Sequence, residues 1–222
     1  MNTTILELTG LAQAVAGEKL TSAFEALGGG DSLEVVCDGE PSGLLQLFQE
    51  KFWGAFDWHP LENGPERWRM TVRRVPGSGR RGIGEFMGFD HERCDVLYAS
   101  MENAAQSGDA EATRSLFGAF ETGMTHHFDM EEKRFFPAFE QATGMTQGPT
   151  TVMRMEHRQM LGVMGQMRQA LAQGDLDGVI RGGGTMMVLM RQHNIKEEQM
   201  LYPMGDMHLG DVQPLLKAMQ TV

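Results

Sequence analysis

The C-terminal part of the sequence contains one arrangement of histidine and glutamate twice, with a constant offset of 66 residues. In each copy a histidine is followed 36 residues later by a second histidine, and a glutamate comes four residues after that. The six residues are His91, His127, Glu131, His157, His193 and Glu197. Gly108-Asp109 and Gly174-Asp175 keep the same offset. Internal duplication is the simplest explanation, and it requires two halves with the same fold.

Long helices are predicted for the segments that carry these residues. The helical pattern is interrupted at Ser107-Gly108-Asp109, at residues 143–150 and at Gln173-Gly174-Asp175. We therefore expect four helices, over residues 86–106, 110–141, 151–172 and 176–201. A short last helix is expected over residues 212–219. Because the connections are short, antiparallel neighbours in an up-down four-helix bundle are favoured.

The spacing within each copy predicts a metal site. A histidine and a glutamate four residues apart lie on one face of a helix, about one turn from each other. The two halves together would enclose four imidazoles and two carboxylates. Two metal ions fit this set if each takes two histidines and the glutamates bridge them, whereas buried glutamates without cations would be costly. The alternative, exposed or hydrogen-bonded polar residues, explains a single copy more easily than a matched pair.

The donor types restrict the choice of metal. Mixed imidazole and carboxylate ligation without a thiolate suits iron, and less specifically manganese or zinc. The two cysteines, Cys37 and Cys94, fall in different predicted domains, so neither a disulfide nor a cysteine-based zinc site is expected.

The first 75 residues have a different pattern. Strands are expected over residues 4–8, 32–37, 56–61 and 67–75, with helices over 18–27 and 41–52. The order βαβαββ predicts a small two-layer α/β domain. Residues 76–85 contain four glycines and a proline, which predicts a flexible linker. The expected fold class is therefore α+β with two domains, 1–75 and 86–222.

Charge and hydropathy exclude other classes of function. The formal net charge of -11 disfavours binding to nucleic acid, which depends on neutralising phosphates. No apolar run approaches the ~18 residues of a membrane span, and no Lys or Arg precedes Lys19 to mark a signal peptide. We therefore expect a cytoplasmic protein with no membrane partner. Neither a nucleophile paired with a base nor a phosphate-binding loop is readable, so no catalytic residue is predicted.

Four further side chains lie near the expected site. His126 points about 100° away from its neighbour His127 on the helix, which favours a surface or supporting position. Cys94 is close enough to approach the site, and Tyr98 and Tyr202 could offer a phenol near it. All three have apolar counterparts in the other half, so core packing is the favoured interpretation. These counterparts are Met160, Met164 and Phe136.

The motifs resemble those of the hemerythrin-like, or HHE cation-binding, family over residues 86–205. The resemblance implies a bundle around a non-haem di-iron centre with an oxo or hydroxo bridge. Oxygen-carrying hemerythrins usually have a fifth histidine and a His-x4-Asp ending. Four histidines with two glutamates are more similar to the iron–sulfur cluster repair proteins and their nitric-oxide-responsive relatives, and leave a position open on both irons.

This resemblance implies binding of a diatomic gas, first of all nitric oxide, in nitrosative stress or denitrification. One alternative is a protein that binds or senses dioxygen. Another is a di-iron nitric oxide reductase, a peroxidase or a cluster repair protein, and a reductase or peroxidase would need an unidentified redox partner.

The N-terminal part resembles the TusA-like domains of unknown function that precede some hemerythrin-like domains. Sulfur carriers of that type use a cysteine at the start of the first helix, whereas residues 12–17 contain none. Sulfur transfer by that route is therefore not expected. Cys37 lies in a predicted strand, where a buried, unreactive thiol is favoured.

Overall fold

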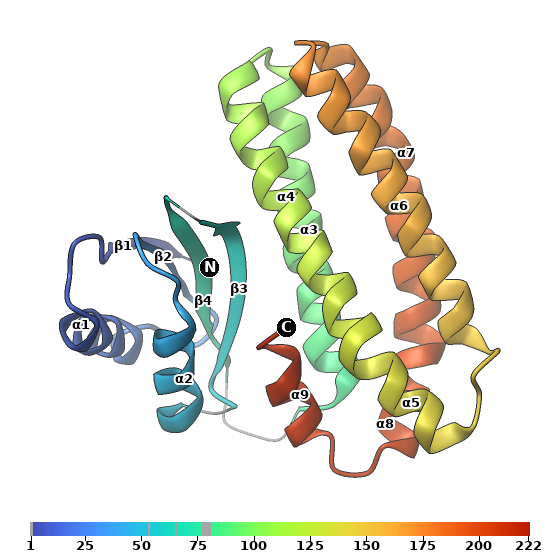
Figure 1. The fold of residues 1–222 in the computed structure, drawn as a ribbon, viewed down its shortest axis with the longest axis horizontal. Coiled ribbons are helices and arrows are strands. Elements are labelled where there is room, and N and C mark those ends of the chain that lie inside the picture. The colour runs from blue at the N-terminus through green and yellow to red at the C-terminus, as the bar shows by residue number, and fades with distance from the viewer. Residues whose placement is uncertain (1, 53, 65, 77–80) are drawn as a thin grey trace. The chain divides into compact units, whose positions relative to one another are not determined.

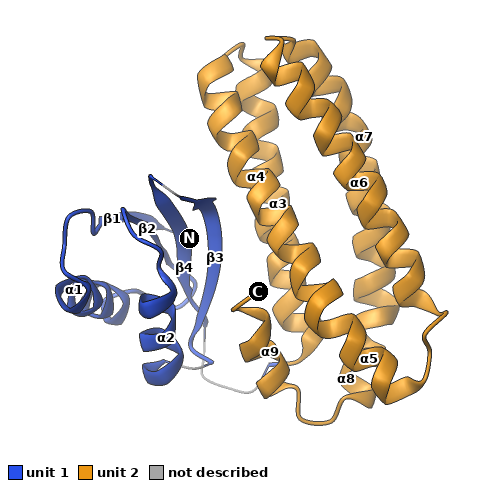
Figure 2. Ribbon diagram, viewed as in Figure 1, with its two compact units in different colours: residues 1–81 blue, residues 82–222 orange. Residues whose placement is uncertain are grey.

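The computed structural model describes residues 2–222 except 53, 65 and 77–80. The chain divides into two compact units, Met1–Arg81 and Gly82–Val222 (Figure 2). The first is a sheet with helices and the second is a helical bundle (Figure 1), which confirms the expected α+β fold class. Four residues of the expected linker, 77–80, lie outside the described residues.

The N-terminal unit has two layers, one of strands and one of helices (Figure 1). Its elements are β1 (Thr3–Glu7), α1 (Gln13–Glu25), β2 (Ser32–Cys37), α2 (Ser42–Lys51), β3 (Phe56–Asn63) and β4 (Trp68–Arg74). The strand order is β1-β2-β4-β3, with β1 parallel to β2 and the other pairs antiparallel. Helix α1 makes the crossover that two parallel neighbours require. Apolar side chains of both helices and of β2, β3 and β4 form one core.

Helix α1 begins at Gln13, five residues before the predicted start. The helix includes Gly17, which is buried where α1 meets α2. A Cβ added at Gly17 would lie 2.9 Å from Cδ2 of Leu47. The glycine therefore permits close helix packing and does not mark a helix end.

The second unit consists of two helical hairpins, one from each half of the repeat (Figure 1). The hairpins are α3 (Ile83–Gln106) with α4 (Ala110–Met130), and α6 (Pro149–Ala172) with α7 (Leu176–Lys196). Helix α3 begins three residues before its predicted start because Asp206 accepts hydrogen bonds from the backbone N–H groups of Ile83 and Gly84. Cys94 and Tyr98 lie in the bundle core with Met160 and Met164, as predicted. No described helix is long and apolar enough to cross a membrane.

Helices α4 and α7 both continue through one π-helical turn, at Glu131 and at Glu197. The following elements are η1 (Glu131–Phe135), α5 (Phe136–Thr143), η2 (Glu197–Leu201), α8 (Tyr202–His208) and a short last helix, α9 (Gln213–Met219). Pro137 and Pro203 explain the wider turns, since proline lacks an N–H group and its ring clashes with the carbonyl four residues earlier. The predicted uninterrupted helices over 110–141 and 176–201 are wrong in this respect.

The inter-helix turns of the two halves have the same cap. Asp109 accepts a hydrogen bond from the N–H of Ala112, and Asp175 accepts one from the N–H of Gly178. We expect Asp109→Ala and Asp175→Ala each to lower the free energy of unfolding of the bundle by about 1 kcal/mol, because each leaves a helix N-terminus without its cap. Urea denaturation of the full chain, followed by helical circular dichroism, measures this. Gln173→Ala, an exposed substitution in the same turn, is the control, and an equal loss there would contradict the assignment.

Candidate metal centre

The structure brings the six repeat residues together inside the bundle. One histidine comes from each long helix: His91 from α3, His127 from α4, His157 from α6 and His193 from α7. The two glutamates are the first residues of the π turns. All six residues are at most 4% exposed. Four helices thus contribute to one buried polar cluster.

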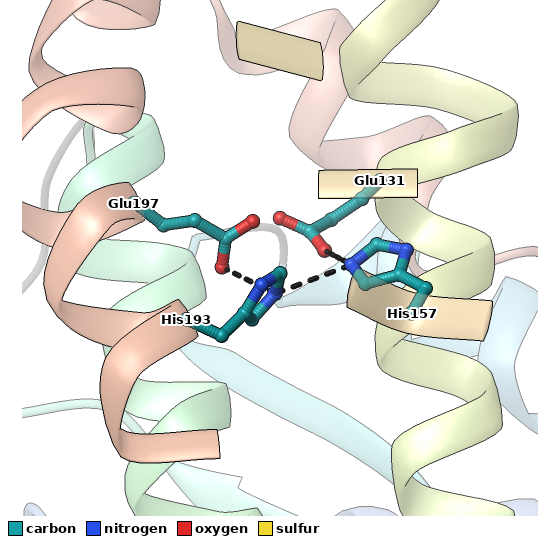
Figure 3. Close-up of side chains that lie close together, drawn as sticks. All are labelled: Glu131, His157, His193 and Glu197. Carbon is teal, nitrogen blue, oxygen red and sulfur yellow. Dashed lines mark hydrogen bonds and ion pairs between the residues drawn. The ribbon is translucent and has the colours of Figure 1, made fainter. Parts of the chain in front are cut away.

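The carboxylates of Glu131 and Glu197 face each other, with the imidazoles of His157 and His193 beside them (Figure 3). Nε2 of His157 lies 3.1 Å from Oε2 of Glu131, and Nε2 of His193 lies 3.2 Å from Oε2 of Glu197. The two Nε2 atoms are 3.2 Å apart. One nitrogen or oxygen from each of these four residues lies within 4.8 Å of the others, close enough to surround one ion.

The histidines of the first half form a second group with Glu197. Atoms of His91, His127 and Glu197 also lie within 4.8 Å of one another. Oε2 of Glu197 is 3.3 Å from Nε2 of His91, and Oε2 of Glu131 is 3.5 Å from Nε2 of His127. Each carboxylate therefore contacts one histidine from each half, the arrangement that a bridging ligand requires.

In each of the four cluster histidines, the ring nitrogen Nδ1 is hydrogen-bonded to a carboxylate. The four pairs, with their distances, are His91–Glu198 at 2.7 Å, His127–Asp90 at 2.8 Å, His157–Glu132 at 2.7 Å and His193–Glu156 at 3.0 Å. In each pair the imidazole uses Nδ1, so Nε2 is left to face the cluster. Carboxylates in this position orient metal-binding histidines and make them more basic.

These four supporting carboxylates were not predicted, although the repeat contains a signal for them. Glu132 and Glu198 each follow a cluster glutamate, and Asp90 and Glu156 each precede a cluster histidine. The π turns begin at the two cluster glutamates. The carbonyls of Glu131 and Glu197 each accept a hydrogen bond from the backbone N–H of the residue five positions later. π turns are frequent at functional sites.

Tyr202 is buried in the core, as favoured from the sequence, and its hydroxyl also contacts the cluster, which was the disfavoured alternative. Its hydroxyl lies 2.8 Å from Oε1 of Glu131, 3.0 Å from Oε2 of Glu197 and 3.2 Å from Nε2 of His91. Its repeat counterpart, Phe136, gave no indication of a polar contact. The rings of Tyr202 and Phe136 are both buried in the core, and Tyr202 differs by its hydroxyl group.

The remaining candidates lie outside the cluster. Tyr98 donates its hydroxyl to Glu102, and Cys94 packs in the core, where burial raises the pKa of its thiol to about 12. His126 is 8% exposed, which excludes the surface position and leaves the supporting position, the other alternative predicted for it. Among the described residues it belongs to neither group of metal-binding atoms.

Charge pairing shifts the pKa values of His91, His157 and Glu197. Burial alone lowers the pKa of His91, but hydrogen bonds to Glu197 and Glu198 outweigh it and raise the value to about 10. His157 is affected in the same way through Glu131 and Glu132, and its pKa is raised to about 9. Burial opposes ionisation of Glu197, yet His193 and His91 hold its pKa well below the usual range.

The residues fit a bound metal. Two atoms that point into the cluster, Nε2 of His127 and Oε1 of Glu197, make no hydrogen bond to any described residue. Buried polar atoms are rarely left in this way, because each costs about 1–3 kcal/mol. Imidazole nitrogen and carboxylate oxygen are donors that iron, manganese and zinc accept. Cations among these atoms would complete their coordination.

Comparison with known protein families gives two matches. The hemerythrin HHE cation-binding domain matches residues 83–205, and DUF2249, an uncharacterised conserved domain, matches residues 5–74. No curated protein and no solved structure matches. The predicted resemblance of the helical unit is therefore confirmed at the level of the family.

The raised histidine pKa values predict how the metal-free protein responds to pH. Protonated His91 and His157 stabilise the fold fully below the unfolded histidine pKa of 6.5, and this stabilisation is lost as pH rises through about 9 and 10. We therefore expect the free energy of unfolding of the metal-free chain to fall between pH 6.5 and pH 10. Urea denaturation with a chelator present measures it.

A matched pair of variants isolates this effect. His157→Gln should reduce the dependence on pH, whereas His208→Gln, which changes an exposed histidine, should retain it. The same pH dependence in both variants would contradict the assignment to the cluster.

Proposed function

The chain belongs to the hemerythrin HHE cation-binding family, and from this premise we propose that its bundle holds two iron ions and binds a diatomic gas there, first of all nitric oxide. The observation that carries the proposal is that Glu131 and Glu197 each contact one histidine from each half. A carboxylate between two pairs of histidines is suited to bridging two cations. Four histidines would be an excess for a single ion that also takes both carboxylates.

Each half would hold one ion. His91 and His127 would hold the first, His157 and His193 the second, and the two glutamates would bridge them. When bound, iron would supply coordination positions for the gas and an electron to share with it. The protein would fix the imidazoles through their carboxylate partners and exclude water from the cluster.

Apolar rings around the cluster support a small neutral ligand. The ring of Phe128 stacks on His157 at a centroid distance of 4.1 Å, and Phe136 lies on the same imidazole at 5.8 Å. Phe135 and Phe139 are also fully buried in this region. Sites lined mainly by aromatic side chains favour apolar ligands, and nitric oxide and dioxygen are both of that kind.

The N-terminal unit gives no support to sulfur transfer or to iron delivery through a thiol. Cys37 is 7% exposed, and its thiol donates to the carbonyl of Gly39 at 3.3 Å. Burial raises the pKa of this thiol, which lowers the fraction of reactive thiolate. We therefore favour gas binding over cluster repair as the function of the bundle.

We expect the purified protein, reconstituted with ferrous iron under anaerobic conditions, to contain about two iron atoms per chain. Glu131→Gln and Glu197→Gln should each lower the iron content to one or fewer, because each removes a bridging carboxylate. Elemental analysis against protein concentration measures this.

Two buried residues provide the controls. His126→Gln and Cys94→Ala change side chains near the cluster that contribute to neither group of metal-binding atoms among the described residues. Both should retain the iron content of the natural sequence. Equal losses in all four variants, or one iron per chain without any substitution, would contradict the ligand assignment.

Nitric oxide and dioxygen are distinguished by the behaviour of the reduced protein. Because the cluster contains four histidines and not the five of oxygen-carrying hemerythrins, we expect exogenous ligands to reach the iron and air to oxidise it within minutes. Under anaerobic conditions the same protein should bind nitric oxide stably. Stopped-flow absorption with each gas measures both reactions. Reversible binding of dioxygen with weak binding of nitric oxide would move the function to oxygen storage or sensing.

A further inference from the structure

The two halves of the cluster differ at one aromatic position. Tyr202 stacks on His91 with ring centroids 5.6 Å apart, and its counterpart Phe136 stacks on His157 at 5.8 Å. Both rings are fully buried. They therefore occupy equivalent places, and the difference between them is a single hydroxyl group.

That hydroxyl lies among atoms that face the metal. His91 is held through Nδ1 by Glu198, so its Nε2 is the atom available to a cation. The hydroxyl of Tyr202 is 3.2 Å from this Nε2 and within 3.0 Å of an oxygen of Glu131 and of Glu197. It thus lies beside the position formed by His91 and His127.

The equivalent ring beside His157, that of Phe136, carries no hydroxyl. His157 lies between the rings of Phe128 and Phe136, with interplanar angles of 21° and 17°. At the 66-residue offset the counterpart of the apolar Phe128 is the polar Asn194. A small neutral molecule would find hydrocarbon beside one metal position and a hydroxyl beside the other.

We propose that Tyr202 closes the metal position of His91 and His127 to exogenous ligands, so that the gas binds at the position of His157 and His193. This inference rests on the proposed function, because it requires two ions per chain. Four histidines and two glutamates alone would leave the two positions equivalent. The hydroxyl of Tyr202 removes that equivalence and gives the centre one binding position.

Azide binding to the full-length diferric protein tests the proposal. Azide occupies open iron positions whichever gas the protein binds, and its stoichiometry is measured by calorimetric and visible titration. We expect one azide per chain for the natural sequence and two for Tyr202→Phe, which removes the hydroxyl and keeps the ring. Phe136→Tyr should weaken azide binding by about tenfold or more, because it places a hydroxyl beside the second position.

Tyr98→Phe is the matched control, since it removes a buried hydroxyl that bonds Glu102 and not the cluster. It should leave the stoichiometry at one. Two azides, or none, on the natural sequence would overturn the proposal, as would one azide on Tyr202→Phe. Tyr202→Phe decides the question by itself if Phe136→Tyr does not fold.

Iron content, measured on every sample, distinguishes a failure of the proposed two-iron centre from a failure of the role assigned to Tyr202. Fewer than two irons per chain in the natural sequence would overturn the proposed function together with this inference. Two irons with the wrong azide stoichiometry would overturn the role of Tyr202 alone.

Discussion

The contact between the carboxylates of Glu131 and Glu197 and the histidines of both halves is the interaction on which the rest of the bundle depends. Four imidazoles and two carboxylates are removed from water at the centre of four helices. Burial on this scale is costly unless every charge has a partner. In the metal-free chain, protons on the imidazoles provide the balancing charge, which is why the pKa values of His91 and His157 are raised. Metal ions would replace those protons, so metal affinity and the fold use the same contacts.

Duplication explains how one chain builds such a centre, and later divergence explains how its halves differ. The π turns, the prolines that follow them and the carboxylates on Nδ1 all recur at the 66-residue offset. The carboxylates themselves are supported differently. Asp90 bonds the buried Arg93, whereas its counterpart Glu156 bonds Lys196, which is partly exposed. Together with the hydroxyl of Tyr202, this makes the two pairs of histidines chemically distinct within a nearly symmetric backbone.

The sequence predicts the fold class and the proximity of the six cluster residues because both follow from local periodicity and from the repeat. It predicts helix boundaries less well where a distant residue decides them. Asp206 extends the start of α3, and the close approach of Leu47 accounts for the glycine within α1. For Tyr202 the sequence favours core packing over a polar contact with the cluster, because its counterpart is a phenylalanine. The carboxylates that hydrogen-bond Nδ1 of the cluster histidines were not predicted, because these contacts depend on how each helix is rotated about its axis.

A crystal structure of the iron-loaded full-length protein, with anomalous diffraction recorded at the iron absorption edge, tests the central claim most directly. We expect two anomalous peaks inside the bundle, one beside His91 and His127 and one beside His157 and His193. The carboxylates of Glu131 and Glu197 should lie between the peaks. A single peak would contradict the two-ion centre. So would two peaks of which one lies away from both pairs of histidines.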